Sequence, residues 1–187
     1  MIQKKILRKK YYSLRKKKYF EIDKKFFFPL IRLIKSNFKE KKLKIALYYP
    51  SNFETNVLKF LENDFTKNKN ILLPVIGEEN NMNFFSWKKN QVLFVNKFGM
   101  LEPKKSKIKI PDVLLIPILA FDIKKYRLGY GKGYYDRYLN KYLKKFKNIL
   151  TVGVAFSFQK HHKLTIDKND VMLNYILTEK GIYWWKY

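Results

Sequence analysis

The sequence predicts an α/β fold with three layers, in which helices flank a largely parallel central sheet. Short apolar runs typical of buried strands alternate along the chain with amphipathic segments of helical period. Strands separated by helices pair in parallel, because the chain must cross over the sheet between them. The 187 residues, of which 47% are hydrophobic, suffice for a sizeable core, so we expect residues 1–187 to form a single domain.

The first half of the chain is expected to begin with a basic helix and to continue with strands. In residues 3–20 several apolar side chains fall near one face of a helix, and the remaining surface is rich in lysine. Residues 43–49 (LKIALYY) indicate a buried strand, and residues 54–65 indicate a helix after a Pro-Ser-Asn turn. Residues 71–76 (ILLPVI) indicate another strand. Because proline has no N–H to donate, Pro74 indicates that this run is the end of a strand or lies at an edge of the sheet.

The second half is expected to supply further strands and an amphipathic helix. The strand-like runs are residues 82–87, 91–96, 112–116, 149–156 and 171–177. Residues 134–146 carry apolar side chains at helical spacing, so we expect a helix there. Ligands of parallel sheets bind beyond the carboxyl ends of the strands, and the glycine-rich segment before this helix is expected to lie at that end.

The chain is strongly basic. With 41 Lys and Arg against 15 Asp and Glu, the formal net charge is +26, a value typical of nucleic-acid-binding proteins. The basic residues are spread along the whole chain, however, and lysine accompanies heavy use of Asn, Ile, Phe and Tyr, a bias that an AT-rich genome imposes. We therefore expect no specific nucleic-acid partner, only weak nonspecific binding at low salt.

Several classes of protein are excluded by what the sequence lacks. Without cysteine there is no disulfide framework, no thiolate zinc site and no thiol nucleophile. The longest apolar runs are far shorter than a membrane span, and the lysine-rich N-terminal residues have no apolar signal region. We expect no membrane partner and a cytoplasmic location.

Residues 127–137, RLGYGKGYYDR, are the most informative segment. Glycines at alternate positions, 129, 131 and 133, can adopt positive φ and let backbone N–H groups approach a phosphate closely. Arg127 and Lys132 add positive charge, and Asp136 could carry the Mg²⁺ that accompanies a nucleotide triphosphate. The spacing matches neither the P-loop nor the dinucleotide fingerprint. From these residues alone, a phosphate-binding loop and a plain glycine-rich turn before a helix are both open.

The wider segment, residues 117–139 (PILAFDIKKYRLGYGKGYYDRYL), strongly resembles the signature of 5-formyltetrahydrofolate cyclo-ligases, also called methenyltetrahydrofolate synthetases. Other landmarks of that family occur in the same order along the chain. They are Lys4 with Arg8, Leu73 with Pro74, Met82 with Phe84, Glu102 with Pro103, and Ala120 to Asp122. The resemblance therefore extends over nearly the whole sequence.

The resemblance implies an enzyme that uses ATP and Mg²⁺ to close 5-formyltetrahydrofolate into 5,10-methenyltetrahydrofolate, with release of ADP and phosphate. In the family's mechanism the formyl oxygen is phosphorylated before the ring closes. Such phosphoryl transfer depends on positioning and charge stabilisation, to which a loop of glycines, cations and a metal ligand is suited. We expect a monomer whose partners are ATP and 5-formyltetrahydrofolate.

The resemblance also implies the residues that bind ATP. Lys4 and Arg8 lie one helical turn apart and would reach the phosphates from the N-terminal helix. The rest of the implied ATP site is Arg127, Leu128, Gly129, Tyr130, Gly131, Lys132, Gly133, Tyr134 and Tyr135. Lys132 and Arg127 are the implied catalytic cations, with Lys132 nearest to the phosphoryl group in transfer.

The resemblance also implies which residues bind the folate and the metal. Tyr130, Gly131, Lys132, Gly133 and Tyr134 would also contact the folate, and Asp136 and Asp170 match metal ligands of the family. The family's folate-contacting glutamate is assigned to Glu54. Counting back from Leu73 gives Glu54, whereas counting forward from the preceding strand gives Asn52, and in that case the carboxylate contact would be absent.

Two other functions compete with the cyclo-ligase. One is a basic nucleic-acid-binding protein that has kept the fold without the chemistry, and intact Arg127, Lys132 and Asp136 argue against it. The other is a different ATP-dependent small-molecule transferase, which binding of Mg-ATP without binding of folate would support.

Overall fold

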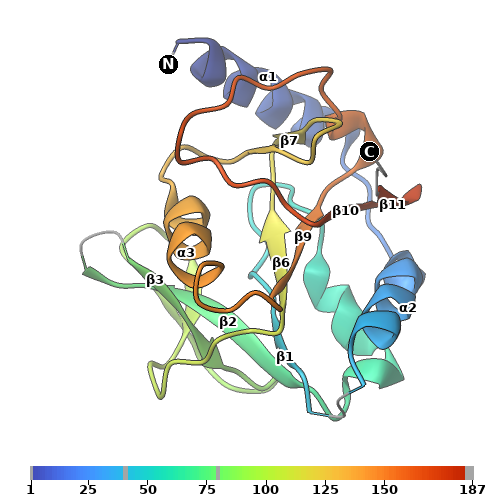
Figure 1. Ribbon diagram of the computed structural model, residues 1–187, viewed down its shortest axis with the longest axis vertical. Helices are drawn as coiled ribbons and strands as arrows, with labels where there is room; N and C mark the ends of the chain where they lie inside the picture. Colours follow the sequence, from blue (N-terminus) through green and yellow to red (C-terminus); the bar gives the residue numbers. More distant parts are fainter. Residues whose placement is uncertain (1, 40–41, 79–80, 184–187) are drawn as a thin grey trace.

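The computed structural model describes residues 2–39, 42–78 and 81–183 (Figure 1). Within these residues, a seven-stranded sheet has the order β11-β10-β9-β6-β1-β2-β3. Neighbouring strands from β10 to β2 run parallel, and the outer strands β11 and β3 pair antiparallel to their neighbours. The predicted α/β fold with a largely parallel sheet is confirmed.

The strands are short. The main sheet comprises β1 (Lys44–Ala46), β2 (Asn70–Ile76), β3 (Met82–Ser86), β6 (Val113–Pro117), β9 (Leu150–Val154), β10 (Tyr175–Thr178) and β11 (Gly181–Tyr183). Two hairpins lie outside it, formed by β4 (Leu93–Val95) with β5 (Leu101–Pro103), and by β7 (Ala120–Phe121) with β8 (Arg127–Leu128).

Helices cover both faces of the sheet. On one face, α2 (Phe28–Asn37) and the 3₁₀ segment η2 (Val57–Glu62) pack against the strands, with Phe27, Leu30 and Phe60 fully buried. On the other face, α3 (Tyr134–Tyr142) buries Tyr138 and Leu139. Alternate residues of a strand point to opposite faces, so the strands supply side chains to both cores, and the three predicted layers are present.

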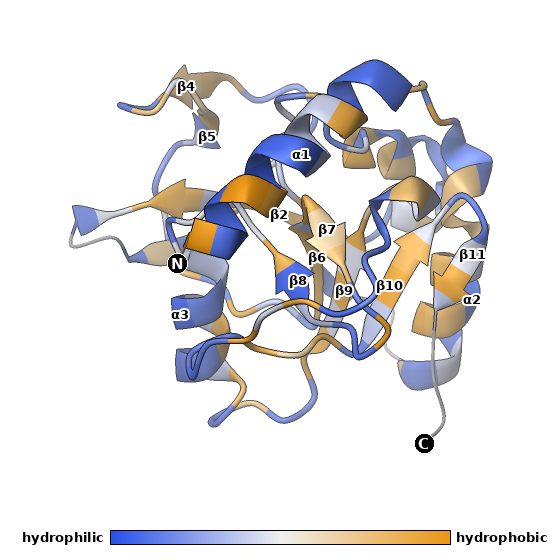
Figure 2. Cartoon of the chain, turned by 90° about the horizontal axis from the view of Figure 1, so that it is seen from above, coloured by the Kyte–Doolittle hydropathy of each residue, from blue (hydrophilic) through white to orange (hydrophobic). Residues whose placement is uncertain are grey.

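The N-terminal helix α1 (Ile2–Lys18) lies across the hairpin β7–β8 and the segment that follows β9 (Figure 2). Its contacts with the body run along a stripe of mainly polar side chains at Lys4, Arg8, Tyr11 and Arg15. This spacing of four, three and four residues places the stripe on one face of the helix. Tyr11 and Arg15 of α1 are buried, and Leu7 and Leu14 pack beside Tyr11 on a small apolar cluster with Leu119, Ala120, Leu128 and Leu164. The helix is therefore attached by polar contacts and by this cluster together.

Two expectations for local structure are wrong. Residues 54–65 do not form an α-helix but the 3₁₀ segments η2 and η3 (Asp64–Thr66), because Asn63 ends the first segment with an extended backbone. Pro74 lies inside β2, between β1 and β3. Since β1 ends at Ala46, which is in register with Leu72, β2 pairs only with β3 at Pro74, and the missing N–H is tolerated there.

The remaining elements match the expected ones with shifted ends. The N-terminal helix ends at Lys18, and α3 ends at Tyr142, short of the predicted residue 146. The helix α2, the hairpin β7–β8 and the strands β5 and β11 have no counterpart among the expected elements. Within the described part of the chain, no helix has the length and apolar character that a membrane crossing requires.

Candidate active site

A cleft of about 430 Å³ opens beyond the carboxyl ends of β1 and β6, the end of a parallel sheet at which ligands usually bind. Its walls come from α1, the turn after β1, β2, β5, the loop after β8 and residues 167–170. Every site residue predicted from the sequence lines this cleft: Lys4, Arg8, Glu54, the whole run 127–136 and Asp170. Segments far apart in the chain therefore meet in one place.

The glycine-rich loop joins β8 to α3. Gly131 and Gly133 have φ values of +98° and +68°, so these positions need the conformational freedom of glycine. Gly133 is also the N-cap of α3, whose positive dipole end therefore faces the cleft. Arg8 Nε donates a 2.8 Å hydrogen bond to the Gly129 carbonyl and packs against Gly131. The loop thus combines backbone N–H groups, a helix N-terminus and cations, as an anion site requires.

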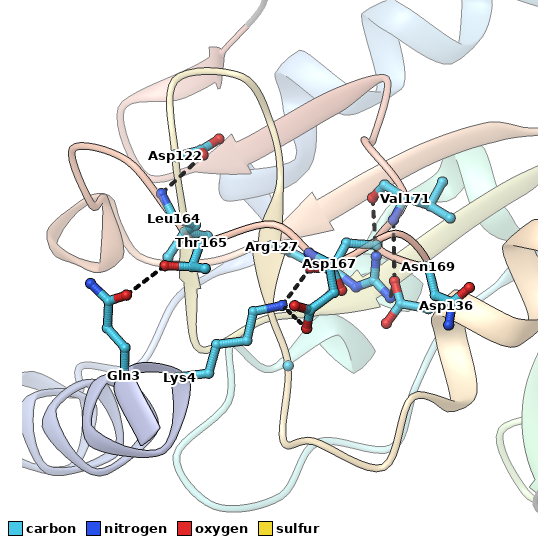
Figure 3. Close-up of polar contacts among 12 residues, drawn as sticks. Gln3, Lys4, Asp122, Arg127, Asp136, Leu164, Thr165, Asp167, Asn169 and Val171 are labelled. Carbon is cyan, nitrogen blue, oxygen red and sulfur yellow. Dashed lines mark hydrogen bonds and ion pairs between the residues drawn. The ribbon is translucent and has the colours of Figure 1, made fainter. Parts of the chain in front are cut away.

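Two cation–carboxylate pairs flank this loop. Arg127, 5% exposed, places Nη2 at 2.7 Å from Asp136 Oδ1, and its Nη1 donates to the Val171 carbonyl (Figure 3). Lys4 Nζ lies 2.5 Å from Asp170 Oδ2 and 2.7 Å from Asp167 Oδ2. Burial lowers the pKa of Lys4, but hydrogen bonds to the two carboxylates and their charges outweigh it, so the pKa is raised and Lys4 is a cation.

Asp136 and Asp170 are the candidate Mg²⁺ ligands. The Val171 N–H points at Asp136 Oδ1, at 3.4 Å, so the carboxylate of Asp136 and the backbone next to Asp170 are neighbours. Across the described residues, three or more His, Cys, Asp or Glu side chains nowhere gather into a metal cluster. Mg²⁺ that accompanies a nucleotide is usually held by one or two carboxylates together with phosphate oxygens. The two aspartates fit an ion of that kind.

Lys132 is exposed at the mouth of the cleft. Its ammonium lies 5.8 Å from the centroid of the Phe98 ring, a cation–π distance, and Phe98 in turn lies near Tyr134. Of these two cations of the loop, Arg127 is held by an ion pair, whereas Lys132 carries its charge at the end of a long, flexible side chain. Lys132 can therefore follow a charge that moves during a reaction.

Glu54 supplies a buried carboxylate from the turn after β1. It is 6% exposed, accepts a 2.7 Å hydrogen bond from the Tyr130 hydroxyl and accepts another, of 2.9 Å, from the Ser51 N–H. Burial raises the pKa of Glu54, and these hydrogen bonds, together with the charge of Arg15, partly oppose that rise. Asn52 also lines the cleft, but of these two candidates Glu54 is the one with a carboxylate, and its carboxylate is buried at the cleft.

Arg15 and Glu102 are polar groups at the site that the sequence analysis does not assign there. Arg15 is buried against Tyr130, and Glu102 accepts hydrogen bonds from the Ile76 N–H at 2.8 Å and from Asn96 Nδ2 at 2.6 Å. Arg15 belongs to a run of lysines and arginines, and nothing in that run marks one of them as buried. Glu102 is one of the family landmarks, and this resemblance is the signal in the sequence that could have placed it at the site.

The sequence profile of the 5-formyltetrahydrofolate cyclo-ligase family matches residues 3–179. A 5-formyltetrahydrofolate cyclo-ligase of Haemophilus influenzae is 32% identical over 140 residues, which cover 71% of this chain and 74% of that protein. A 5-formyltetrahydrofolate cyclo-ligase of Mycoplasma genitalium is 32% identical over 137 residues, 71% of this chain and 70% of that protein.

The fold is also that of solved relatives. The NMR structure of the Aquifex aeolicus 5,10-methenyltetrahydrofolate synthetase superposes with a TM-score of 0.73 and 33% identity, over 96% of this chain and 91% of that one. The 5,10-methenyltetrahydrofolate synthetase from Mycoplasma pneumoniae superposes with a TM-score of 0.70 and 28% identity, over 94% and 98%. From the sequence match, the shared fold and the glycine-loop cleft together, we conclude that this chain is an enzyme of the 5-formyltetrahydrofolate cyclo-ligase family.

Proposed function

We propose that this enzyme couples the cleavage of ATP, with Mg²⁺, to the ring closure of 5-formyltetrahydrofolate, giving 5,10-methenyltetrahydrofolate, ADP and phosphate. One observation carries the proposal: Lys4, Arg8, Arg127, Lys132, Asp136 and Asp170 line a single cleft together with Glu54. The cations and the helix N-terminus suit the triphosphate, and the buried carboxylate of Glu54 suits a polar heterocycle with N–H donors.

The chemical problem is that the oxygen of an amide-like formyl group is a poor leaving group. In the proposed reaction this oxygen attacks the γ-phosphorus, the bond from that phosphorus to the β-phosphate oxygen breaks, and ADP leaves. N10 of the folate then attacks the formyl carbon, the carbon–oxygen bond breaks, and phosphate departs with that oxygen while N10 loses its proton. The oxygen thus leaves as part of phosphate.

The side chains of the loop would stabilise the charge that develops during phosphoryl transfer. Arg127 is fixed by its ion pair and its hydrogen bond to Val171, so it would hold the phosphates in place. Lys132, at the cleft mouth, would follow the γ-phosphoryl group, and Lys4 and Arg8 would bind the triphosphate from α1. Bound Mg²⁺, held by Asp136 and Asp170, would neutralise part of the phosphate charge.

The folate would occupy the side of the cleft away from the cations. Apolar lining for a ring system is supplied by Pro74, Ile76, Met82, Met100 and Leu101. Glu54 would accept hydrogen bonds from the N–H donors at the edge of the pterin ring, and Tyr130 would lie against the same ring. This arrangement would bring the formyl oxygen toward the glycine loop.

The test is the near-ultraviolet absorbance of the methenyl product when purified protein meets 5-formyltetrahydrofolate and Mg-ATP. The proposal requires a signal that depends on ATP and is lost in Lys132→Ala. A folded protein that gives no signal but binds nucleic acid tightly and with strong salt dependence would overturn it. A monomeric state and a cytoplasmic location belong to the same proposal, and sedimentation analysis and fractionation would test them.

A further inference from the structure

Arg15 is a buried cation on a helix whose other cations are largely exposed. Its side chain is 1% exposed and is the largest fully buried side chain among the described residues. Removing a guanidinium from water is costly unless its charge and donors are satisfied. None of the binding and catalytic roles proposed for the cleft involves Arg15, although its burial must be compensated.

The partners of Arg15 are oxygens of three separate segments. Nη1 donates to the carbonyl of Ile118 at 3.3 Å, and Nη2 donates to the carbonyl of Asn52 at 2.7 Å and to the hydroxyl oxygen of Tyr130. Its Cζ atom lies 5.5 Å from the centroid of the Tyr130 ring. Among the described residues, no carboxylate forms a direct ion pair with Arg15, and its Nε is without a hydrogen-bond partner. The nearest compensating charge therefore acts through another group.

That group is the Tyr130 hydroxyl, which links Arg15 to Glu54. A guanidinium has donors and no acceptor, so at the contact with Arg15 the phenol oxygen must accept. The hydroxyl has a single proton, which is then available for Glu54 Oε1, at 2.7 Å. The contact with Arg15 thereby fixes the direction of the Tyr130 hydroxyl.

The same contacts hold the turn that presents Glu54. Asn52 and Phe53 have φ values of +50° and +61°, an uncommon conformation for two consecutive residues with side chains. Arg15 binds the Asn52 carbonyl of this turn and Tyr130 of the glycine loop at once. Removal of Arg15 would free the turn and the loop from each other and leave Glu54 with hydrogen bonds but no nearby cation.

We propose that Arg15 is a positioning residue for the folate side of the cleft: it directs the Tyr130 hydroxyl proton at Glu54 and so keeps that carboxylate ionised. The role rests on the proposed function, in which ionised Glu54 accepts hydrogen bonds from the pterin ring. Other titratable groups around Glu54 are Tyr48, after β1, and Tyr135, in α3, and both are neutral acids near neutral pH. Arg15 is thus the cation that acts on Glu54 from α1.

The first experiment needs no catalysis. Protein labelled with ¹³C at the glutamate carboxyl carbons is titrated by NMR, and the Glu54 signal is assigned with Glu54→Gln. In Arg15→Met the Glu54 signal should titrate about one pH unit higher than in the wild type, and Arg15→Lys should restore part of the difference. Tyr130→Phe, which keeps Arg15, should also raise the titration. An unchanged Glu54 titration in both Arg15→Met and Tyr130→Phe would overturn the proposal.

Kinetics provide the second readout. In Arg15→Met the KM for 5-formyltetrahydrofolate should rise about tenfold, while the KM for ATP changes little. In a plot of kcat/KM for 5-formyltetrahydrofolate against pH, the acidic limb should move to higher pH. In protein that already carries Tyr130→Phe, Arg15→Met should raise the KM for 5-formyltetrahydrofolate much less than it does in the wild type. Leu30→Ala, which removes a buried side chain of α2 far from the cleft residues, controls for lost stability and should leave the pH profile in place. Equal rises of both KM values would contradict a role on the folate side.

The two proposals fail in different ways. If the wild type forms no methenyl product, the proposed function fails, and the NMR titration still decides the role of Arg15. If the wild type is active but Glu54 titrates at the same pH with and without Arg15, the proposed function stands and the inference about Arg15 is wrong.

Discussion

Arg127 and Asp136 form an ion pair, with 2.7 Å between Nη2 and Oδ1, that joins the two ends of the glycine-rich loop. The loop between them contains Gly129, Gly131 and Gly133, which would be the most mobile part of the cleft without such a closure. The pair also brings the proposed phosphate-binding arginine and a proposed metal ligand into contact. Phosphate and Mg²⁺ would each take one partner of this pair, so their binding should be interdependent.

Lys132→Ala should lower kcat by roughly 10²- to 10³-fold, because a cation at the transferring phosphoryl group stabilises charge that develops in the transition state. Initial rates of methenyl formation at saturating ATP and folate measure this. Lys145→Ala, an exposed lysine that does not line the cleft, is the matched control and should retain the wild-type rate. A loss confined to the KM for ATP would assign Lys132 to binding alone.

Gly131→Ala should weaken ATP binding more than Gly129→Ala. A Cβ at position 131 would sit at a φ of +98° and only 3.1 Å from Arg8 Cζ, whereas one at position 129 would meet no heavy atom within 4 Å. The left-handed backbone costs a residue with a Cβ about 1–2 kcal/mol, and Arg8 would be displaced in addition. Titration calorimetry with ATP compares the two variants, and equal affinities would mean that the left-handed turn is not needed for phosphate.

Asp136→Asn should raise the Mg²⁺ concentration needed for half-maximal rate by about ten- to a hundredfold, since an amide is a weaker ligand than a carboxylate. The substitution also removes the ionic partner of Arg127. Rates measured against Mg²⁺ concentration at fixed ATP test this. The exposed Asp64, which lies on the opposite face from α3, provides Asp64→Asn as a control. An unchanged Mg²⁺ requirement would remove Asp136 from the metal site.

Glu54→Gln should stabilise the protein at neutral pH while it weakens folate binding. Burial raises the pKa of Glu54, so the folded state holds this proton more tightly than the unfolded state does. Stability from this group is therefore present below the unfolded pKa and declines as pH rises through the folded pKa.

The Tm of Glu54→Gln relative to the wild type should thus increase as pH is raised from about 4 to about 8, with roughly 2–4 °C for each kcal/mol. Thermal unfolding followed by circular dichroism at several pH values measures the trend. A constant difference across this range would show that Glu54 has the same pKa in the folded and the unfolded state, and would contradict the raised pKa.

Local periodicity predicted the layers and the parallel sheet, and the contiguous motif of residues 127–137 predicted the glycine loop of the cleft. The other cleft residues, Lys4, Arg8, Glu54 and Asp170, were implied by the family resemblance. Elements whose existence depends on distant partners were missed. The strands β7 and β8 have two residues each and exist only because they pair with each other. The helix α2 is an exception, because Pro29 in its first turn is a local start signal, and the expected elements nevertheless did not include this helix.

Arg15 shows most clearly why the site could not be completed from the sequence. Its neighbours along the chain are solvated lysines, and its contacts are with Asn52, Ile118 and Tyr130, which lie 37, 103 and 115 residues away. No local pattern encodes such contacts. The same holds for the error at Pro74, where the outcome depends on how far β1 extends alongside β2.

The polar stripe of α1 also determines how this helix can move. Salt weakens the ion pairs of this stripe, and the apolar cluster around Tyr11 is small beside the two apolar cores of the sheet. The helix should therefore open as a separate unit well before the sheet unfolds, and its amide hydrogens should exchange faster than those of β6. A triphosphate bound by Lys4 and Arg8 would hold α1 in its docked position. The measured affinity for ATP would then include the free energy of docking this helix. Moderate salt would lower the affinity for ATP by weakening the attachment of α1, in addition to any effect on the phosphate contacts themselves.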